Sequence, residues 1–330
     1  MLNQFDYLPE GLLSVATADL ADLLEHPTLI HLPGERSQPL FISTLLHGNE
    51  TTGFRAIQQL LERYPQGLPR ALSVFIGNVE AAAAGVRMLP GQADFNRVWP
   101  GTPDHRCQEA DLMQTVTGIM RARRPFASID IHNNTGRNPH YACVNVLSAH
   151  SLQVASRFSE TIVYFTSPKG VQSSTFAEFC PAVVLECGQS SDADSVDHAT
   201  RFLDTMINLG SIPGDHPHDV NIYHTVARVK VPGQLSISTS ADSDIRIDSA
   251  LEQMNFRQLD AGSVFARSTS EHPLLVLNES NEDVTGDVFE RQQDALMLRR
   301  DVILSMFTTD ITAIRQDVLC YFMERLSIQP

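Results

Sequence analysis

Up to about residue 210, short apolar runs typical of buried strands alternate with segments in which apolar residues recur at helical spacing. Strands are predicted over residues 28–32, 39–46, 71–77, 126–131, 141–147, 161–165 and 182–187. Helices are predicted over residues 17–24, 51–64, 79–84, 109–123 and 195–209. This alternation predicts an α/β fold in which helices flank a largely parallel or mixed sheet. The Gly- and Pro-rich residues 85–104 are predicted to form a long loop, and loops of this length are often functional.

The pattern changes at residues 210–217, whose Gly and Pro content is typical of a linker. Runs rich in β-forming residues follow at residues 222–231, 234–239, 263–266 and 274–277. The tail, residues 310–326, has helical periodicity. We therefore predict an α/β catalytic domain over residues 1–213 and a smaller, β-rich domain over residues 214–330. The tail helix of the second domain could pack back on the first.

The charge of the chain limits its partners. The formal net charge is −15 at pH 7, whereas nucleic acids and anionic membranes call for a basic surface. We therefore expect a small-molecule substrate and neither a nucleic acid nor a membrane as partner. An acidic substrate would need a local cationic pocket. The sequence also allows a homo-oligomer.

Other features favour a cytoplasmic protein. The N-terminal segment lacks the basic and apolar regions of a signal peptide, and no apolar run approaches membrane-spanning length. The five cysteines are scattered and show no CxxC spacing, so we expect reduced thiols that are mostly buried.

Potential metal ligands lie at the ends of two predicted strands. His47 ends the strand over residues 39–46, and Glu50 follows in the first turn of the next helix. His132 ends the strand over residues 126–131. Open α/β sheets place their sites at the carboxyl ends of strands, so these three side chains are expected to converge. Two His and one carboxylate leave a fourth position open, as in catalytic zinc sites, and we predict one Zn²⁺ per chain.

A proton acceptor and two cations are predicted near this centre. Zinc lowers the pKa of water, and a nearby carboxylate must then take and return a proton. Glu186, which lies in an otherwise apolar predicted strand, is the candidate. Arg87 and Arg97 belong to the long loop, where they could stabilise an oxyanion and clamp a substrate carboxylate.

Four short motifs follow one another along the chain: His47-Gly48-Asn49-Glu50, Asp94-Phe95-Asn96-Arg97, Asp130-Ile131-His132-Asn133 and Leu185-Glu186-Cys187-Gly188. In this order they resemble the motifs of the succinylglutamate desuccinylase/aspartoacylase family, which belongs to the zinc-carboxypeptidase superfamily. The likeness extends from about residue 40 to residue 280. It implies a mixed sheet flanked by helices, with a smaller β domain that partly roofs the pocket.

The resemblance also implies catalytic roles. His47, Glu50 and His132 would bind zinc. Glu186 would act as general base and then as general acid, and Arg87 would contact the substrate carbonyl and the oxyanion. These roles imply the hydrolysis of the amide bond of a small, anionic N-acyl amino acid.

Further residues would bind substrate or orient the ligands. Asn96 and Arg97 would hold the carboxylate of the amino-acid half, and Asn133 is a third candidate for substrate binding. Asp94 and Asp130 would orient the metal ligands or the loop.

The chain departs from the family on the far side of the pocket. Aspartoacylases carry an arginine about ten residues before the general base, and Phe176 stands at that place here. Arg137, His140 and Lys169 are candidates for the missing cation. The acyl group is therefore left open.

Two other functions remain open at this point. The first is a carboxypeptidase-like metallopeptidase that acts on small peptides. The second is a zinc-fold protein without catalytic activity that binds a ligand or partner. The four intact motifs favour an enzyme over the second alternative.

Overall fold

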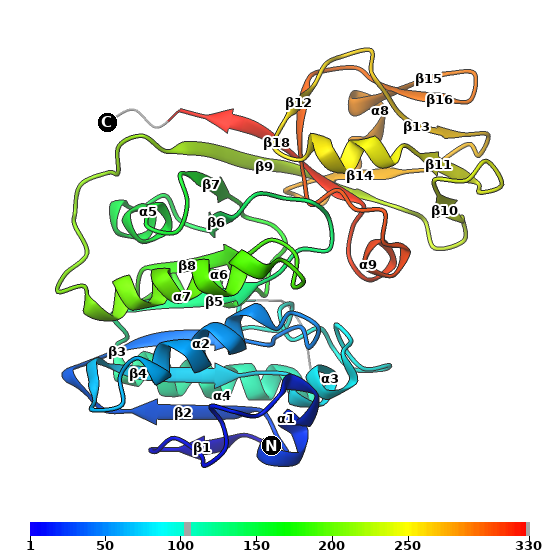
Figure 1. Cartoon of the computed structure of the whole chain (residues 1–330). Coiled ribbons are helices and arrows are strands. Elements are labelled where there is room, and N and C mark those ends of the chain that lie inside the picture. The colour runs from blue at the N-terminus through cyan, green and yellow to red at the C-terminus, as the bar shows by residue number, and fades with distance from the viewer. Residues whose placement is uncertain (102–106, 328–330) are drawn as a thin grey trace.

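The computed structural model describes residues 1–101 and 107–327. A large sheet extends through most of the molecule (Figure 1). Within these residues, the sheet has 13 strands in the order β1-β2-β4-β3-β5-β8-β6-β7-β9-β18-β17-β12, with β14 beside β9. Its N-terminal strands are β1 (Asn3–Phe5), β2 (Thr28–Leu32), β3 (Gly34–Thr44), β4 (Leu68–Ile76), β5 (Ala127–His132), β6 (Tyr141–Val144), β7 (Thr161–Tyr164) and β8 (Ala182–Glu186). Its C-terminal strands are β9 (Asn221–Lys230), β12 (Gln258–Leu259), β14 (Leu275–Asn278), β17 (Val302–Ser305) and β18 (Cys320–Leu326).

Helices cover both faces of the N-terminal half of this sheet. One face packs against α2 (Thr52–Glu62), α5 (Ala149–Ser156) and α7 (Ala193–Asn208) in a mainly aliphatic core. The other face packs against α4 (Gln108–Arg123) and α6 (Gln172–Phe176) in a core rich in aromatic residues. Shorter helices are η1 (Thr17–Asp19), α1 (Leu20–Leu24) and α3 (Val79–Ala84).

The strands at the centre of the sheet run in one direction. β3 pairs in parallel with both β4 and β5, and β5 pairs in parallel with β8. Their carboxyl ends therefore meet at one edge of the sheet. All the strands and helices predicted up to residue 210 are present, with bounds that differ by a few residues, and the α/β fold is confirmed.

The sheet continues beyond the predicted linker. β9 pairs in parallel with β7 and in antiparallel fashion with β18, so the strands on either side of residue 213 share one sheet. A second sheet follows the order β10-β11-β13-β16-β15. Its members are β10 (Ile237–Ser238), β11 (Ile245–Ile247), β13 (Val264–Ser268), β15 (Phe289–Gln292) and β16 (Ala295–Leu298), with η2 (Ser249–Met254) and α8 (Thr285–Val288) nearby. The β-rich character of this half is confirmed, and the domain boundary at residue 213 stays a prediction.

The prediction of a helix over residues 310–326 is wrong. Only α9 (Ile311–Gln316) is helical, and the chain then enters β18. The first four residues of β18, from Cys320 to Met323, are all buried, because the strand lies inside the sheet between β9 and β17. A short apolar run buried on both sides cannot be told from a helix by periodicity alone.

The long loop is anchored rather than loosely attached. Trp99 is fully buried and makes edge contacts with Phe75 and Phe176, at ring-centroid distances of 6.1 and 5.8 Å. Its backbone N–H donates to the carbonyl of Gly170 at 3.0 Å. Residues 85–101 are described and form turns and irregular structure, as predicted, whereas residues 102–104 of the predicted loop lie outside the described residues.

Candidate metal centre and active site

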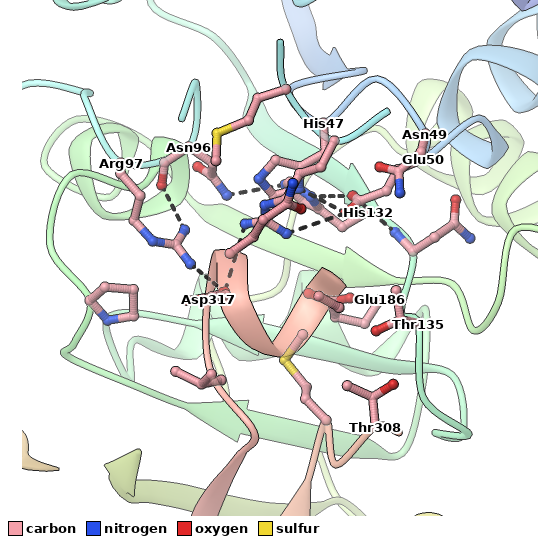
Figure 2. Close-up of a pocket in the computed structure, with 18 of the residues that line it drawn as sticks. His47, Asn49, Glu50, Asn96, Arg97, His132, Thr135, Glu186, Thr308 and Asp317 are labelled. Carbon is pink, nitrogen blue, oxygen red and sulfur yellow. Dashed lines mark hydrogen bonds and ion pairs between the residues drawn. The ribbon is translucent and has the colours of Figure 1, made fainter. Parts of the chain in front are cut away.

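The carboxyl ends of β3, β5 and β8 bring four of the predicted residues together (Figure 2). His47 follows β3, and Glu50 lies just before α2. His132 and Glu186 are the last residues of β5 and β8, and they are direct neighbours in the register of this strand pair. The sheet therefore sets the spacing between a predicted metal ligand and the predicted general base.

The turn between His47 and Glu50 requires a residue without a side chain. A Cβ atom at Gly48 would lie 2.2 Å from the backbone carbonyl carbon of Ala81 in α3, which no real contact allows. The Gly48 N–H donates to the carbonyl of Arg87 at 3.0 Å. This close approach holds the turn against α3 and against the start of the long loop.

The three predicted ligands form a compact, buried group. One oxygen of Glu50 lies 2.7 Å from Nδ1 of His47, and the other lies 2.7 Å from Nδ1 of His132. Ligand atoms of all three residues lie within 4.8 Å of one another. Both imidazole rings therefore turn the same nitrogen toward the carboxylate.

Outer carboxylates hold the opposite nitrogen of each ring. Asp94 lies 3.1 Å from Nε2 of His47, and Asp130 lies 2.8 Å from Nε2 of His132. The hydroxyl of Ser43 donates to Asp130 at 2.7 Å. Such carboxylate–histidine pairs fix the ring orientation at zinc sites and raise the basicity of the ligand. The donor set and its supports thus fit a divalent metal such as zinc.

The charges of the group are coupled. Burial alone would raise the pKa of Glu50, but His47 and His132 outweigh burial and hold this pKa below its usual range. Burial alone would lower the pKa of His132, but Asp130 and Glu50 raise it well above the ordinary value. The site therefore attracts positive charge, whether it comes from protons or from a metal ion.

Glu186 has the opposite character. Burial, together with the negative charges of Glu50 and Asp130, raises its pKa to about 8. The side-chain N–H of Asn134 donates to Oε2 of Glu186 and holds the carboxyl group in place. A carboxyl group with a pKa near neutrality is suited to both accepting and returning a proton.

Two arginines and two aspartates form an ion-pair network beside the ligands. Arg87 Nη2 lies 2.9 Å from Asp94 and 3.7 Å from Asp317, and Arg97 Nη2 lies 2.8 Å from Asp317. Burial would raise the pKa of Asp317, but the two arginines lower it. The Nε of Arg87 is buried and has no hydrogen-bond partner among the described residues, and Arg87 belongs to the lining of the cavity described below.

The two asparagines predicted to bind substrate are held differently. Asn96 faces the cavity, with Nδ2 at 3.2 Å from Nε2 of His132 and Oδ1 accepting from the backbone N–H of Gln172. The side chain of Asn133 bonds to the backbone and hydroxyl of Thr52 and to the carbonyl of Gly188. Asn133 therefore fixes the start of α2. It also belongs to the cavity lining, and its role in substrate binding stays a prediction.

The three predicted ligands, Glu186, the two arginines and Asn96 line a cavity of about 750 Å³. Residues from the C-terminal part of the chain close it on one side, including Thr312, Gln316 and Asp317 in and after α9. Figure 1 places α9 on the side of the carboxyl ends of the central strands. The resemblance to the family implied a partial roof by the C-terminal region, and the structure places residues of this region there.

The motifs missed two residues of the site, and some candidates lie elsewhere. Asp317 lines the cavity but lies far from the motifs along the chain, and Asn134, which holds Glu186, adjoins a motif without belonging to it. Among the described residues, the cavity lining does not include the three candidate cations, Arg137, His140 and Lys169. Phe176 does not line the cavity either: it is fully buried and stacks on Phe41 at a centroid distance of 4.7 Å.

Comparison with known families decides the affiliation of the chain. The sequence model of the succinylglutamate desuccinylase/aspartoacylase catalytic domain matches residues 37–210, more than half of the chain. The chain belongs to this family. Family membership supports a hydrolase that acts on N-acyl amino acids, as the motifs predicted.

Relatives of this family extend the match beyond the catalytic domain. Succinylglutamate desuccinylase of Yersinia enterocolitica is 23% identical over 292 residues, which cover 80% of this chain and 85% of that protein. The crystal structure of murine aminoacylase 3 has a TM-score of 0.61 at 16% identity, covering 88% of this chain and 96% of that one. Succinylglutamate desuccinylase of Chromobacterium violaceum has a TM-score of 0.57 at 16% identity, covering 89% and 87%. At these identities, the solved structures establish the fold.

No helix among the described residues is long and apolar enough to cross a membrane. The cytoplasmic location, the oligomeric state and the exclusion of nucleic acid stay predictions.

Proposed function

We propose that this chain hydrolyses the amide bond of small N-acyl amino acids, with one zinc ion per chain held by His47, Glu50 and His132. The observation that carries the proposal is the register of β5 and β8. It sets the ligand His132 directly beside Glu186, at the edge of a cavity of about 750 Å³.

Different groups of the site serve the separate steps of amide hydrolysis. When bound, zinc supplies a Lewis acid that polarises the substrate carbonyl and lowers the pKa of water. Glu186 takes the proton from the attacking water and gives it to the leaving nitrogen, so one carboxyl group serves as base and then as acid. The positive charge of a bound zinc ion would lower the pKa of Glu186 and so favour its carboxylate form before the reaction begins.

Arg87 and Arg97 supply the remaining positive charge. Arg87 lines the cavity, so its guanidinium group can stabilise the oxyanion that forms on the carbonyl oxygen. Arg97, together with Asn96, is placed to hold the carboxylate of the amino-acid half. Asp317 already contacts both guanidinium groups, so the substrate carboxylate must share or replace this contact.

The shape of the cavity favours a small substrate over a peptide. Its volume is within the range of sites for small molecules, and α9 together with the residues after it closes one side. A longer peptide would need an open path past this wall. This observation supports a deacylase over the alternative of a carboxypeptidase-like enzyme.

A substrate panel tests the proposal. Purified protein loaded with zinc is incubated with N-acetyl, N-succinyl and longer N-acyl amino acids and with dipeptides, and the release of free amine is measured with and without a chelator. We expect chelator-sensitive release from at least one N-acyl amino acid. Release from no member of the panel would contradict the proposed function, and release from dipeptides alone would favour the peptidase.

A further inference from the structure

The surface of the cavity beside Glu186 is built from uncharged side chains. In the antiparallel pair of β8 and β6, Glu186 lies opposite Tyr141 and Val184 opposite Cys143. In the parallel pair of β6 and β7, Cys143 lies beside Val163. Side chains two residues apart on a strand share one face of a sheet, so Val184 and Cys143 lie on the same face as Glu186.

We call the row formed by Val184, Cys143 and Val163 the floor of the cavity. All three residues line the cavity together with Glu186, and each is buried. Phe165, just after β7, and Val171 extend this apolar surface. Burial raises the pKa of the Cys143 thiol well above its ordinary value, so the thiol is neutral at physiological pH.

Permanent positive charge is confined to another part of the cavity. Of the described residues in the lining, only Arg87 and Arg97 are arginine or lysine, and both already contact Asp317. Arg137 and Lys169 are exposed and lie outside the lining. Arg228 also lies outside the lining, and its Nη1 donates to the hydroxyl of Ser167, a lining residue, at 2.8 Å. A carboxylate placed on the floor would therefore lose hydration with no arginine or lysine of the described lining beside it, which is costly.

Phe176 contributes neither charge nor surface to the floor. Its ring packs against Phe41 and Trp99 in the aromatic core on the face covered by α4 and α6. The residue therefore contributes to packing between the sheet and its helices. Besides Arg87 and Arg97, the described residues of the cavity lining provide no arginine or lysine.

We propose that the substrate presents an uncharged, apolar group to the floor, in place of the second carboxylate of a succinyl or aspartyl group. This inference rests on the function proposed above and narrows its substrate class to N-acyl amino acids with a single carboxylate. That carboxylate lies toward Asn96 and Arg97, and a branched aliphatic or aromatic group lies on Val184, Cys143 and Val163. Either the side chain of the amino acid or the acyl chain can supply the apolar group.

Four matched substrates test the inference and identify the half that reaches the floor. N-acetyl-L-phenylalanine carries the apolar group on the amino acid, and N-hexanoylglycine carries it on the acyl side. N-acetyl-L-aspartate and N-succinylglycine carry a second carboxylate at the corresponding places. We expect kcat/KM for the better apolar substrate to exceed that for both anionic substrates at least tenfold.

A size-changing variant shows whether the floor itself determines this preference. Val163→Phe fills the space above the floor, so the ratio of kcat/KM for the better apolar substrate to kcat/KM for N-acetylglycine should fall at least tenfold. Val264→Phe is the matched control, because Val264 is 42% exposed and lies in β13 of the second sheet. Cys143→Leu serves the same purpose if Val163→Phe does not fold.

A second readout does not depend on turnover. Calorimetry on the metal-free protein should show tighter binding of N-acetyl-L-phenylalanine or N-hexanoylglycine than of their anionic counterparts, and Val163→Phe should weaken that binding. A kcat/KM for either anionic substrate that equals or exceeds that for the better apolar substrate, or tighter binding of the anionic substrates, would overturn the inference and leave the deacylase function standing. Cleavage of none of the N-acyl amino acids would overturn the proposed function and this inference together.

Discussion

Arg97 and Asp317 form an ion pair of 2.8 Å between residues that are 220 positions apart in the sequence. Arg97 belongs to the long loop beside the predicted metal ligands, and Asp317 directly follows α9 (Figure 2). The pair therefore joins the region matched by the family's catalytic domain to the end of the chain. It also places a carboxylate of the protein where the carboxylate of a substrate is expected.

Replacing Asp317 tests both its link to Arg97 and its competition with the carboxylate of a substrate. Asp317→Asn should lower KM for an N-acyl amino acid several-fold, because Arg97 and Arg87 no longer share their charge with a carboxylate. The same change should lower the free energy of unfolding by about 1–3 kcal/mol, since asparagine keeps only a neutral hydrogen bond. Steady-state kinetics and chemical denaturation measure the two quantities.

A surface pair provides the control for this prediction. Asp294 and Arg267 also lie 2.8 Å apart, but their side chains are 46% and 40% exposed; Arg267 lies in β13 and Asp294 in the turn between β15 and β16. Asp294→Asn should change both KM and stability very little. An unchanged or higher KM in Asp317→Asn would show that Asp317 does not compete with substrate.

The role of Glu186 in proton transfer can be separated from its place beside the ligands. Glu186→Gln keeps an oxygen that can accept from Asn134, but it can no longer take a proton. We expect kcat to fall by about 100- to 10,000-fold while the zinc content stays at one ion per chain. Kinetics together with metal analysis by mass spectrometry measures both, and substantial remaining activity would remove Glu186 from the mechanism.

The ligand assignment makes a prediction about metal content. His132→Ala removes one of three protein ligands, so the purified variant should hold far less zinc than the wild-type protein after dialysis against a weak chelator. His140→Ala is a suitable control, because His140 is a half-buried histidine outside the described lining of the cavity. Full zinc occupancy of His132→Ala would contradict the assignment.

The raised pKa of Glu186 has a consequence for the stability of the metal-free protein. Its pKa rises from 4.5 to about 8 on folding, so the folded state holds this proton more tightly than the unfolded state does. The resulting contribution to stability is complete below pH 4.5 and is lost as the pH rises toward 8, on the order of a few kcal/mol in all.

Glu186→Gln isolates this contribution, because glutamine does not titrate. In the presence of a chelator, the melting temperature of the wild-type protein relative to that of Glu186→Gln should fall between pH 5 and pH 8.5. Carboxylates with a lowered pKa, such as Glu50, act in the opposite sense, but they are present in both proteins. A difference in melting temperature that does not vary with pH would show that Glu186 titrates normally.

Local sequence patterns predicted the site residues at the strand ends and missed those that the C-terminal part of the chain contributes to the cavity. His47, His132 and Glu186 could be found because each lies at or just beyond the end of an apolar run, where a parallel sheet gathers side chains at one edge. Asp317 could not be found, since its position depends on β18 joining the sheet beside β9. The floor of the cavity likewise depends on how β6, β7 and β8 pair, and the sequence alone does not show which strands are neighbours.

Asn133 and Phe176 show a second limit of sequence patterns. Asn133 follows the predicted ligand His132, yet its side chain makes its hydrogen bonds to Thr52 and Gly188. The resemblance to the family places Phe176 on the far side of the pocket, yet it lies in the core. A motif fixes where the backbone passes, whereas packing decides which way each side chain points.

The pairing of β7 with β9 makes the catalytic part of this chain dependent on the part that follows it. A fragment that stops at residue 213 would leave the β7 edge unpaired and open to aggregation, and it would lose the partner of Arg97. The C-terminal third is therefore not an accessory that could be gained, exchanged or lost by itself. A substitution in this third can therefore change the wall of the cavity and the stability of the main sheet at the same time.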